Sequence, residues 1–130
     1  LHDALPISEV FGVLQCMEKI QKEVSKHSGV EVPEMLIEPL LRNGIGDRTD
    51  AVAMTTKRIA ENYTAEIMKK LIAHGYREEL VHLYIIDGGG CLLQNFSDLT
   101  AKPEVTVITD ICANAKGYEA LAMMKQRMRG

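Results

Sequence analysis

The first clear pattern along the chain is a helical alternation of apolar and charged positions between residues 8 and 27. Lysines and glutamates fill one face, and apolar residues recur every three or four positions on the other. These apolar positions are Val10, Phe11, Val13, Leu14, Met17, Ile20 and Val24. The spacing predicts an amphipathic helix that ends at Ser28-Gly29.

Two more helices are predicted before residue 76. Pro33 is placed to begin a short helix that ends at Asn43-Gly44, in spite of Pro39 within it. Asp50 is the expected N-cap of the longest helix, which would end at His74-Gly75. The apolar stripe predicted for this helix consists of Val52, Ile59, Tyr63, Ile67 and Leu71.

After Glu79 the pattern changes to short, continuous apolar runs. The segment "LVHLYIID", residues 80–87, predicts a strand buried on both faces of a parallel sheet. "CLLQNF" then predicts a short helix, and "VTVIT" predicts a second strand. One face of a final predicted helix, from about Asn114, carries Tyr118, Leu121, Ala122, Lys125 and Met128. This order of elements predicts an α/β fold with two parallel strands.

Two parallel strands are too few for a stable sheet, so we expect the chain to be a piece of a larger α/β protein. The first residues support the same expectation. "LHDALPI", residues 1–7, is the translation of a DNA string that resembles the end of a common short-read sequencing adapter, and we interpret it as non-native. The alternative is an ordinary amphipathic leader in which Asp3 caps a helical turn.

Composition narrows the class of protein. The chain has 130 residues, of which 46% are hydrophobic and 25% charged, as expected of one soluble globular domain. Its net charge of −3 and the absence of a basic stripe argue against direct nucleic-acid binding. The three cysteines form no metal-binding pair, which favours reduced thiols in a cytoplasmic protein without structural zinc. No apolar run approaches the ~20 residues that span a bilayer, so no membrane partner is expected.

The most informative motif is the glycine run that follows the first predicted strand. Gly88, Gly89 and Gly90 stand between a strand and a helix. Glycines there let the backbone approach a ligand, and the free N–H groups and positive dipole end of the helix suit a nucleotide. The alternative is a simple strand-to-helix turn. The dinucleotide fingerprint fits poorly, because Leu93 stands where a third glycine is needed.

A second segment makes the motif more specific. About twenty residues after "DGGGCLLQNF" comes "VTVITDICANAKGYEALA". Together they resemble the adenosine-binding motif and the hinge segment of the actin, sugar-kinase and heat-shock-chaperone superfamily. "ANAKGYEALA", residues 113–122, is especially similar to the bacterial plasmid-segregation actins of the ParM/StbA type.

The resemblance implies a fold and its division into parts. Residues 8–130 would be the C-terminal part of the second lobe of an actin-like (ribonuclease H-like) ATPase fold, that is, helices plus two parallel strands of a truncated sheet. Residues 33–75 would form a helical subdomain, and residues 80–128 would carry the adenosine-binding and hinge segments.

The resemblance also implies which residues form the site. The backbone of Gly88, Gly89 and Gly90 would contact adenosine and the nearby phosphate. The hinge between the lobes would be formed by Asp110, Asn114 and Gly117.

Two charged residues are further candidates for nucleotide binding. Asp87 departs from the family pattern, in which a small or uncharged polar residue precedes the glycines, and a carboxylate aimed at phosphates would be repulsive. We therefore expect Asp87 to point away or to bond to ribose hydroxyls. Lys57, with Arg58 beside it, would lie near adenine or ribose; the alternative is a solvated helix face.

The function implied is that of a filament-forming ATPase. The complete protein would bind ATP or ADP with Mg²⁺, polymerise with itself, and move plasmid DNA in the cytoplasm through a small DNA-binding adaptor protein. The Asp-x-Gly-x-x phosphate loops of the superfamily are missing from this sequence, so we assign no catalytic residue and expect the chain alone to be inactive. The alternatives are another ATPase or small-molecule kinase of the same superfamily, or a non-catalytic α/β module.

Overall fold

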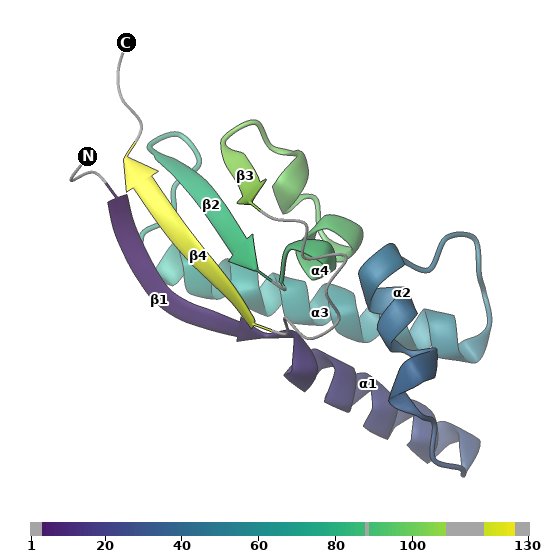
Figure 1. Ribbon diagram of the computed structural model, residues 1–130. Coiled ribbons are helices and arrows are strands. Elements are labelled where there is room, and N and C mark those ends of the chain that lie inside the picture. The colour runs from purple at the N-terminus through teal and green to yellow at the C-terminus, as the bar shows by residue number, and fades with distance from the viewer. Residues whose placement is uncertain (1–3, 88, 109–118, 127–130) are drawn as a thin grey trace.

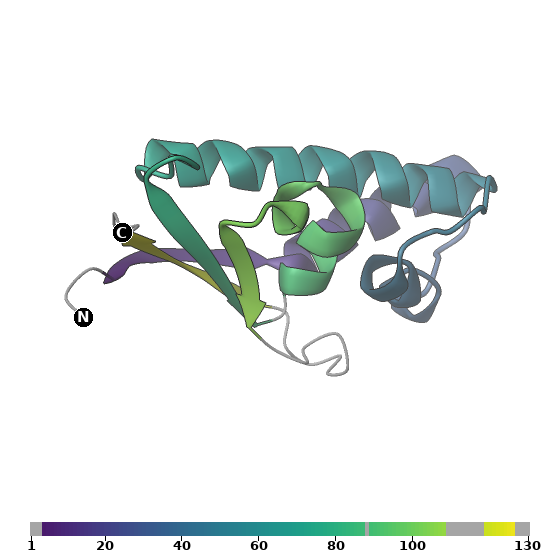
Figure 2. The same ribbon diagram turned by 90° about the horizontal axis from the view of Figure 1, so that it is seen from above.

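The computed structural model describes residues 4–87, 89–108 and 119–126, which form a mixed α/β structure. A four-stranded sheet lies on one side, and the long helix α3 and the short helix α4 pack against one of its faces (Figures 1 and 2). In chain order the elements are β1 (Ala4–Gly12), α1 (Val13–Ser28), η1 (Glu34–Leu36), α2 (Glu38–Asn43), α3 (Ala51–Ala73), β2 (Val81–Asp87), α4 (Gly89–Phe96), η2 (Leu99–Ala101), β3 (Val105–Ile108) and β4 (Glu119–Gln126).

The sheet has the strand order β1-β4-β2-β3. Strands β2 and β3 are parallel, with Ile86 opposite Ile108, so the prediction that these two strands are parallel is confirmed. The prediction that they are the only strands of the sheet is wrong, because β1 and β4 belong to it too. Strand β4 lies between β1 and β2 and is antiparallel to both. The sheet is therefore mixed. Its interior strands are β4 and β2, and β4 is the last described strand in the sequence.

Strand β4 overturns the prediction of a final helix, as far as residues 119–126 are concerned. Its sequence, "EALAMMKQ", consists mostly of residues that favour helices when neighbouring strands are ignored. Between two strands, however, the backbone N–H and C=O groups on both sides can join ladders, and this tertiary pairing outweighs intrinsic propensity. The rest of the predicted helix, and the hinge residues Asp110, Asn114 and Gly117, lie outside the described residues.

The first predicted helix begins later than expected, at Val13 instead of residue 8. Val10 and Phe11 belong to β1, where they pair with Leu121 and Ala120. β-branched and aromatic residues favour strands, and Gly12 would weaken a helix interior. The helical spacing of the apolar residues therefore predicted a helix at Val10 and Phe11 where the chain forms a strand. Residues 4–7 also lie in β1, and the adapter interpretation stays a prediction.

Strand β2 is buried on one face only, contrary to the prediction of burial on both. Val81, Leu83 and Ile85 are buried against the helices. His82 and Tyr84 alternate with them and are partly exposed on the opposite face, where their rings lie 4.6 Å apart. The reason is that the helices cover only one face of the sheet (Figure 2). Side chains of a strand point alternately to the two faces, so every second residue of β2 is buried.

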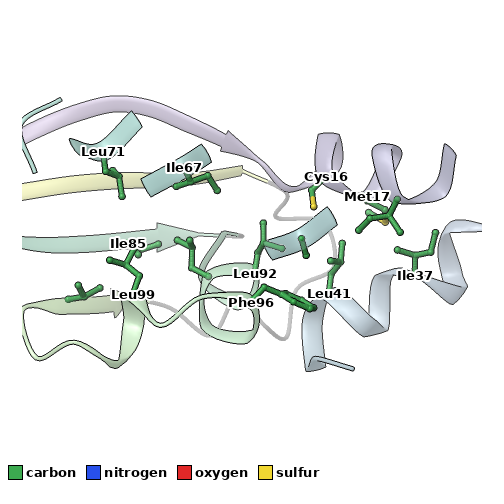
Figure 3. Close-up of a cluster of buried hydrophobic side chains, with 14 of the residues drawn as sticks. Cys16, Met17, Ile37, Leu41, Ile67, Leu71, Ile85, Leu92, Phe96 and Leu99 are labelled. Carbon is green, nitrogen blue, oxygen red and sulfur yellow. The ribbon is translucent and has the colours of Figure 1, made fainter. Parts of the chain in front are cut away.

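The hydrophobic core lies between the sheet and the helices α3 and α4 and continues among α1, α2 and α3 (Figure 3). Every described element from α1 to β3 except η1 contributes to it. Its fully buried large side chains include Met17, Ile20, Ile37, Leu71, Leu83, Ile85, Leu92, Leu93 and Leu99. Helix α3 buries Ala53, Thr56, Ala60, Thr64, Ile67 and Leu71. Small residues in the first half of this stripe allow neighbouring backbones to approach closely, and the predicted Val52, Ile59 and Tyr63 lie at its margin.

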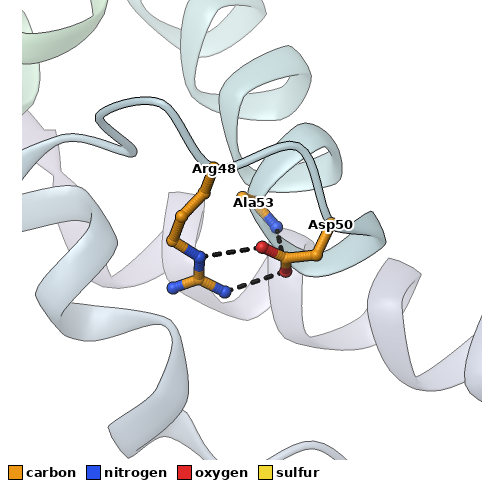
Figure 4. A network of polar contacts seen from close by, with 3 residues as sticks. All are labelled: Arg48, Asp50 and Ala53. Atoms are coloured by element: carbon orange, nitrogen blue, oxygen red, sulfur yellow. Dashed lines mark hydrogen bonds and ion pairs between the residues drawn. The ribbon is translucent and has the colours of Figure 1, made fainter.

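The predicted ends of α3 are confirmed. Asp50 caps the helix, because its Oδ2 accepts a hydrogen bond from the Ala53 backbone N–H at 3.2 Å (Figure 4). Arg48 holds this carboxylate through two hydrogen bonds of 2.8 Å. Helix α3 ends at Ala73, and Gly75 follows with φ of +103°, a conformation that suits glycine after a helix.

Candidate functional site

The candidate site is the junction of strand, glycine run and helix between β2 and α4. Strand β2 ends at Asp87 and α4 begins at Gly89, so Gly89 and Gly90 form part of the first helical turn. The first N–H groups of a helix have no acceptor within the helix, and its dipole makes this end positive. An anion or a polar edge of a ligand is the natural partner of such groups. Gly88 lies outside the described residues.

Strand β3 brings a second segment to the same end of the sheet. Because β2 and β3 are parallel and Ile86 pairs with Ile108, their carboxyl ends lie side by side. Ligands of open α/β sheets bind beyond the carboxyl ends of neighbouring parallel strands. The predicted hinge residue Asp110 comes two positions after the end of β3, but it is not among the described residues, nor are Asn114 and Gly117. Their proximity to the glycines stays a prediction.

Three buried side chains and one hydrogen bond fix helix α4 at this junction. Leu92, Leu93 and Phe96 are buried in the core. The Thr64 hydroxyl of α3 donates a hydrogen bond to the Phe96 carbonyl at 3.0 Å, in a buried position. These contacts hold α4 against the middle of α3 and set the direction in which its N-terminus points.

Asn95 joins α4 to α2, a contact that sequence reasoning missed. Its Nδ2 donates to the Leu41 carbonyl at 3.0 Å and to the Arg42 carbonyl at 2.8 Å. These carbonyls lie in the last turn of α2, where helices lack partners for their C=O groups. Asn95 thus acts as a side-chain cap from another helix. Because Asn95 is far from α2 in the sequence, no local motif indicates this contact.

The two charged candidates take different positions. Asp87 is the last residue of β2 and pairs in register with Ala120 of β4. Lys57 lies in the second turn of α3 and is exposed to solvent. The alternative interpretation, in which Lys57 lies on a solvated helix face, predicts this exposure.

Three side chains with clearly shifted pKa values lie in the core or at the N-terminus of α3. Burial raises the pKa of the Cys16 thiol to about 12, so Cys16 stays a neutral, weakly nucleophilic core residue. Burial and the nearby Glu104 carboxylate raise the pKa of Tyr76 to about 12, and the Tyr76 hydroxyl lies 3.3 Å from Glu104 Oε1. The hydrogen bonds from Arg48 lower the pKa of Asp50 to about 2. None of these three residues belongs to the predicted nucleotide site.

The described residues provide no evident metal centre. Among them, no group of three or more His, Cys, Asp or Glu side chains is placed to hold a metal ion. The resemblance implies Mg²⁺ ligands in the superfamily's phosphate loops, which this sequence lacks, so the described residues do not test them. Of the described helices, none combines the length and the apolarity needed to cross a membrane.

Comparison with protein-family models, curated proteins and solved structures finds no match to this chain.

Proposed function

We propose that this chain is the adenosine-binding part of an actin-like ATPase that polymerises into filaments for plasmid segregation. The observation that carries the proposal is the junction of β2, the glycine run and α4, with the parallel strand β3 alongside. The sequence at this junction is the one that resembles the superfamily's adenosine-binding motif. The arrangement offers a ligand the unpaired N–H groups of a helix at the carboxyl edge of parallel strands.

The chain's own contribution would be binding. The glycine backbone at the start of α4 would lie against adenosine and the nearby phosphate, while Thr64 and Asn95 position the helix from α3 and α2. Phosphoryl transfer depends on positioned charges and metal ions around the phosphates. Because the sequence lacks the superfamily's phosphate loops, hydrolysis would require the complete protein, in which Mg²⁺ accompanies ATP or ADP.

The partners follow from the same proposal. The complete protein would associate with further copies of itself in the cytoplasm and would reach DNA through a small DNA-binding adaptor protein. Light scattering of the complete protein tests the filament directly, because ATP-dependent scattering is expected of a polymerising actin. Its absence, together with phosphorylation of a small molecule, would favour a kinase of the same superfamily.

Nucleotide binding by the chain is tested with ADP that carries a fluorescent label on the ribose. We expect an increase in fluorescence anisotropy that unlabelled ADP reverses, and a Kd at least about tenfold higher for Gly90→Ala, because a Cβ would keep the backbone from the ligand. Alanine is a better helix former than glycine, and circular dichroism verifies that the variant is folded. Gln94→Ala, at an exposed position of α4 away from its first turn, is the control and should leave the Kd unchanged. No binding by the unsubstituted chain at millimolar nucleotide would favour a non-catalytic α/β module.

A further inference from the structure

Two adjoining hollows lie along α3, on the side that faces the end of α4 and η2. The first has a volume of about 230 Å³ and lies between Glu61, Ala65 and Met68 of α3 and the segment that contains Asp98 and Leu99. The second has a volume of about 300 Å³ and is lined by Met68, Ile72 and Tyr76 and by Lys102. Met68 lines both. We call the two hollows together the α3 groove.

The floor of the α3 groove is apolar. Leu93 and Leu99 are almost completely buried beneath it, and Met68 is partly buried. Ile72 is 47% exposed and adds an apolar side chain to the open part of the groove. The lining positions of α3 follow helical spacing from Glu61 to Ile72 and form a line of about three turns, roughly 16 Å long.

The rim of the groove has an excess of negative charge. Glu61 and Asp98 border the first hollow, and Glu78 and Glu79 border the second. The basic side chains among the lining residues are Arg77 and Lys102.

Both basic side chains are engaged within the chain. The Lys102 Nζ donates to Glu78 Oε2 at 3.2 Å. The Arg77 guanidinium donates to the backbone carbonyls of Ile72 and Tyr76. Lys102 and Glu78 balance each other, and Arg77 keeps its positive charge beside Glu79. The acidic excess therefore consists of Glu61 and Asp98 at the first hollow, where it favours a cationic partner.

We propose that the α3 groove binds an amphipathic helix of a partner protein, with leucine- or methionine-like residues on one face and lysines or arginines beside them. The two hollows are at or below the lower end of the ~300–1,000 Å³ of small-molecule pockets, so they fit single side chains better than a whole ligand. Apolar side chains one to two turns apart would enter them, as in helix-in-groove recognition. The flanking basic residues would meet the acidic rim. This site is independent of the proposed nucleotide site, which lies at the other end of α4.

The test measures the binding of a fluorescein-labelled, fourteen-residue peptide that has leucines at helical spacing and lysines elsewhere. A second peptide carries glutamates in place of the lysines. We expect the basic peptide to bind at least about tenfold more tightly to the full chain, with an affinity that falls as salt is raised. Equal affinity for the two peptides, or no anisotropy change with the basic one at 100 µM chain, would overturn the proposal.

Two pairs of variants place the binding on the groove. Glu61→Lys should weaken binding of the basic peptide about tenfold, while Glu66→Lys, the same charge change at an exposed glutamate of α3 outside the groove, should not. Ile72→Ser should weaken binding similarly, while Leu80→Ser, at a leucine that is 55% exposed and outside the groove, should not. Circular dichroism verifies that each variant is folded. Equal losses within either pair would contradict the proposed location.

Discussion

At the scale of single residues, two buried threonines of α3 differ in hydrogen bonding. Thr64 Oγ1 lies 2.9 Å from the Glu61 carbonyl oxygen and 3.0 Å from the Phe96 carbonyl oxygen, and its single hydroxyl proton is shared between them. Thr56 is fully buried, yet within the described part of the chain its Oγ1 has no hydrogen-bond partner. A buried polar atom without a partner loses its hydrogen bonds to water and forms none within the protein, which costs free energy. The two positions therefore allow the same substitution to be compared with and without a hydrogen bond.

We expect Thr56→Val to leave the free energy of unfolding unchanged or to raise it by up to about 1 kcal/mol, because an unsatisfied hydroxyl is replaced by a methyl group of similar size. Thr64→Val should lower it by about 1–2 kcal/mol, because the buried Phe96 carbonyl loses its donor. Threonine and valine have similar helix propensities, so the difference reports hydrogen bonding. Urea denaturation followed by circular dichroism provides the measurement. A larger loss for Thr56→Val than for Thr64→Val would contradict the assignment.

At the scale of elements, the first turn of α3 is stabilised by a charged cap. Asp50 accepts from the Ala53 N–H and is held by Arg48, whose hydrogen bonds lower its pKa to about 2. A carboxyl whose pKa is lower in the folded than in the unfolded chain stabilises the fold when ionised. This contribution is complete above the unfolded pKa of ~3.9 and is lost as the pH falls through about 2.

We expect Asp50→Asn to have a lower Tm than the unsubstituted chain at pH 7, because asparagine keeps the cap but loses the ion pair with Arg48. The difference in Tm should shrink as the pH falls from about 4 to about 2, where Asp50 becomes protonated in the folded chain too. Thermal unfolding at a series of pH values measures this. A difference that is constant over this range would mean that the charge of Asp50 does not contribute.

Elements with local signals could be predicted from the sequence, and elements that depend on distant partners could not. Asp50 and Gly75 mark the ends of α3 because a cap and a positive φ are local properties. The strand, glycine run and helix around Gly89 were likewise found from adjacent residues. The strand at residues 119–126 was missed, because only its two neighbours in the sheet select an extended backbone there. Within the candidate site, Asn95 was missed for the same reason, since its acceptors lie on α2.

At the scale of the whole molecule, the two ends of the described chain meet in the sheet. Ala4 pairs with Lys125, and Gly12 pairs with Glu119 (Figure 1). The ladder is irregular between Pro6 and Val10, so β1 consists of two short paired stretches. Only the first stretch falls within the residues interpreted as an adapter translation.

A chain that begins at Ser8 should therefore keep the pairs at Val10, Phe11 and Gly12 and should melt within about 3 °C of the 130-residue chain. A chain that begins at Val13 lacks all of β1 and should melt at least about 8 °C lower. Differential scanning calorimetry of the three chains makes the comparison. If removal of residues 1–7 costs as much as removal of all of β1, these seven residues belong to the folded protein.

The position of β4 also has a consequence for biosynthesis. Strand β4 lies between β1 and β2, but the ribosome makes it after both of them. Until Gln126 has left the exit tunnel, β1 has no strand beside it and β2 lacks its neighbour on that side. Between the synthesis of β2 and that of β4, the nascent chain therefore holds unpaired edges on both β1 and β2, and the pairing that follows has a high contact order. Two factors would determine what fraction of the chains completes the sheet before two copies associate through these edges. They are the translation rate of the final segment and the binding of chaperones to exposed strands during that time.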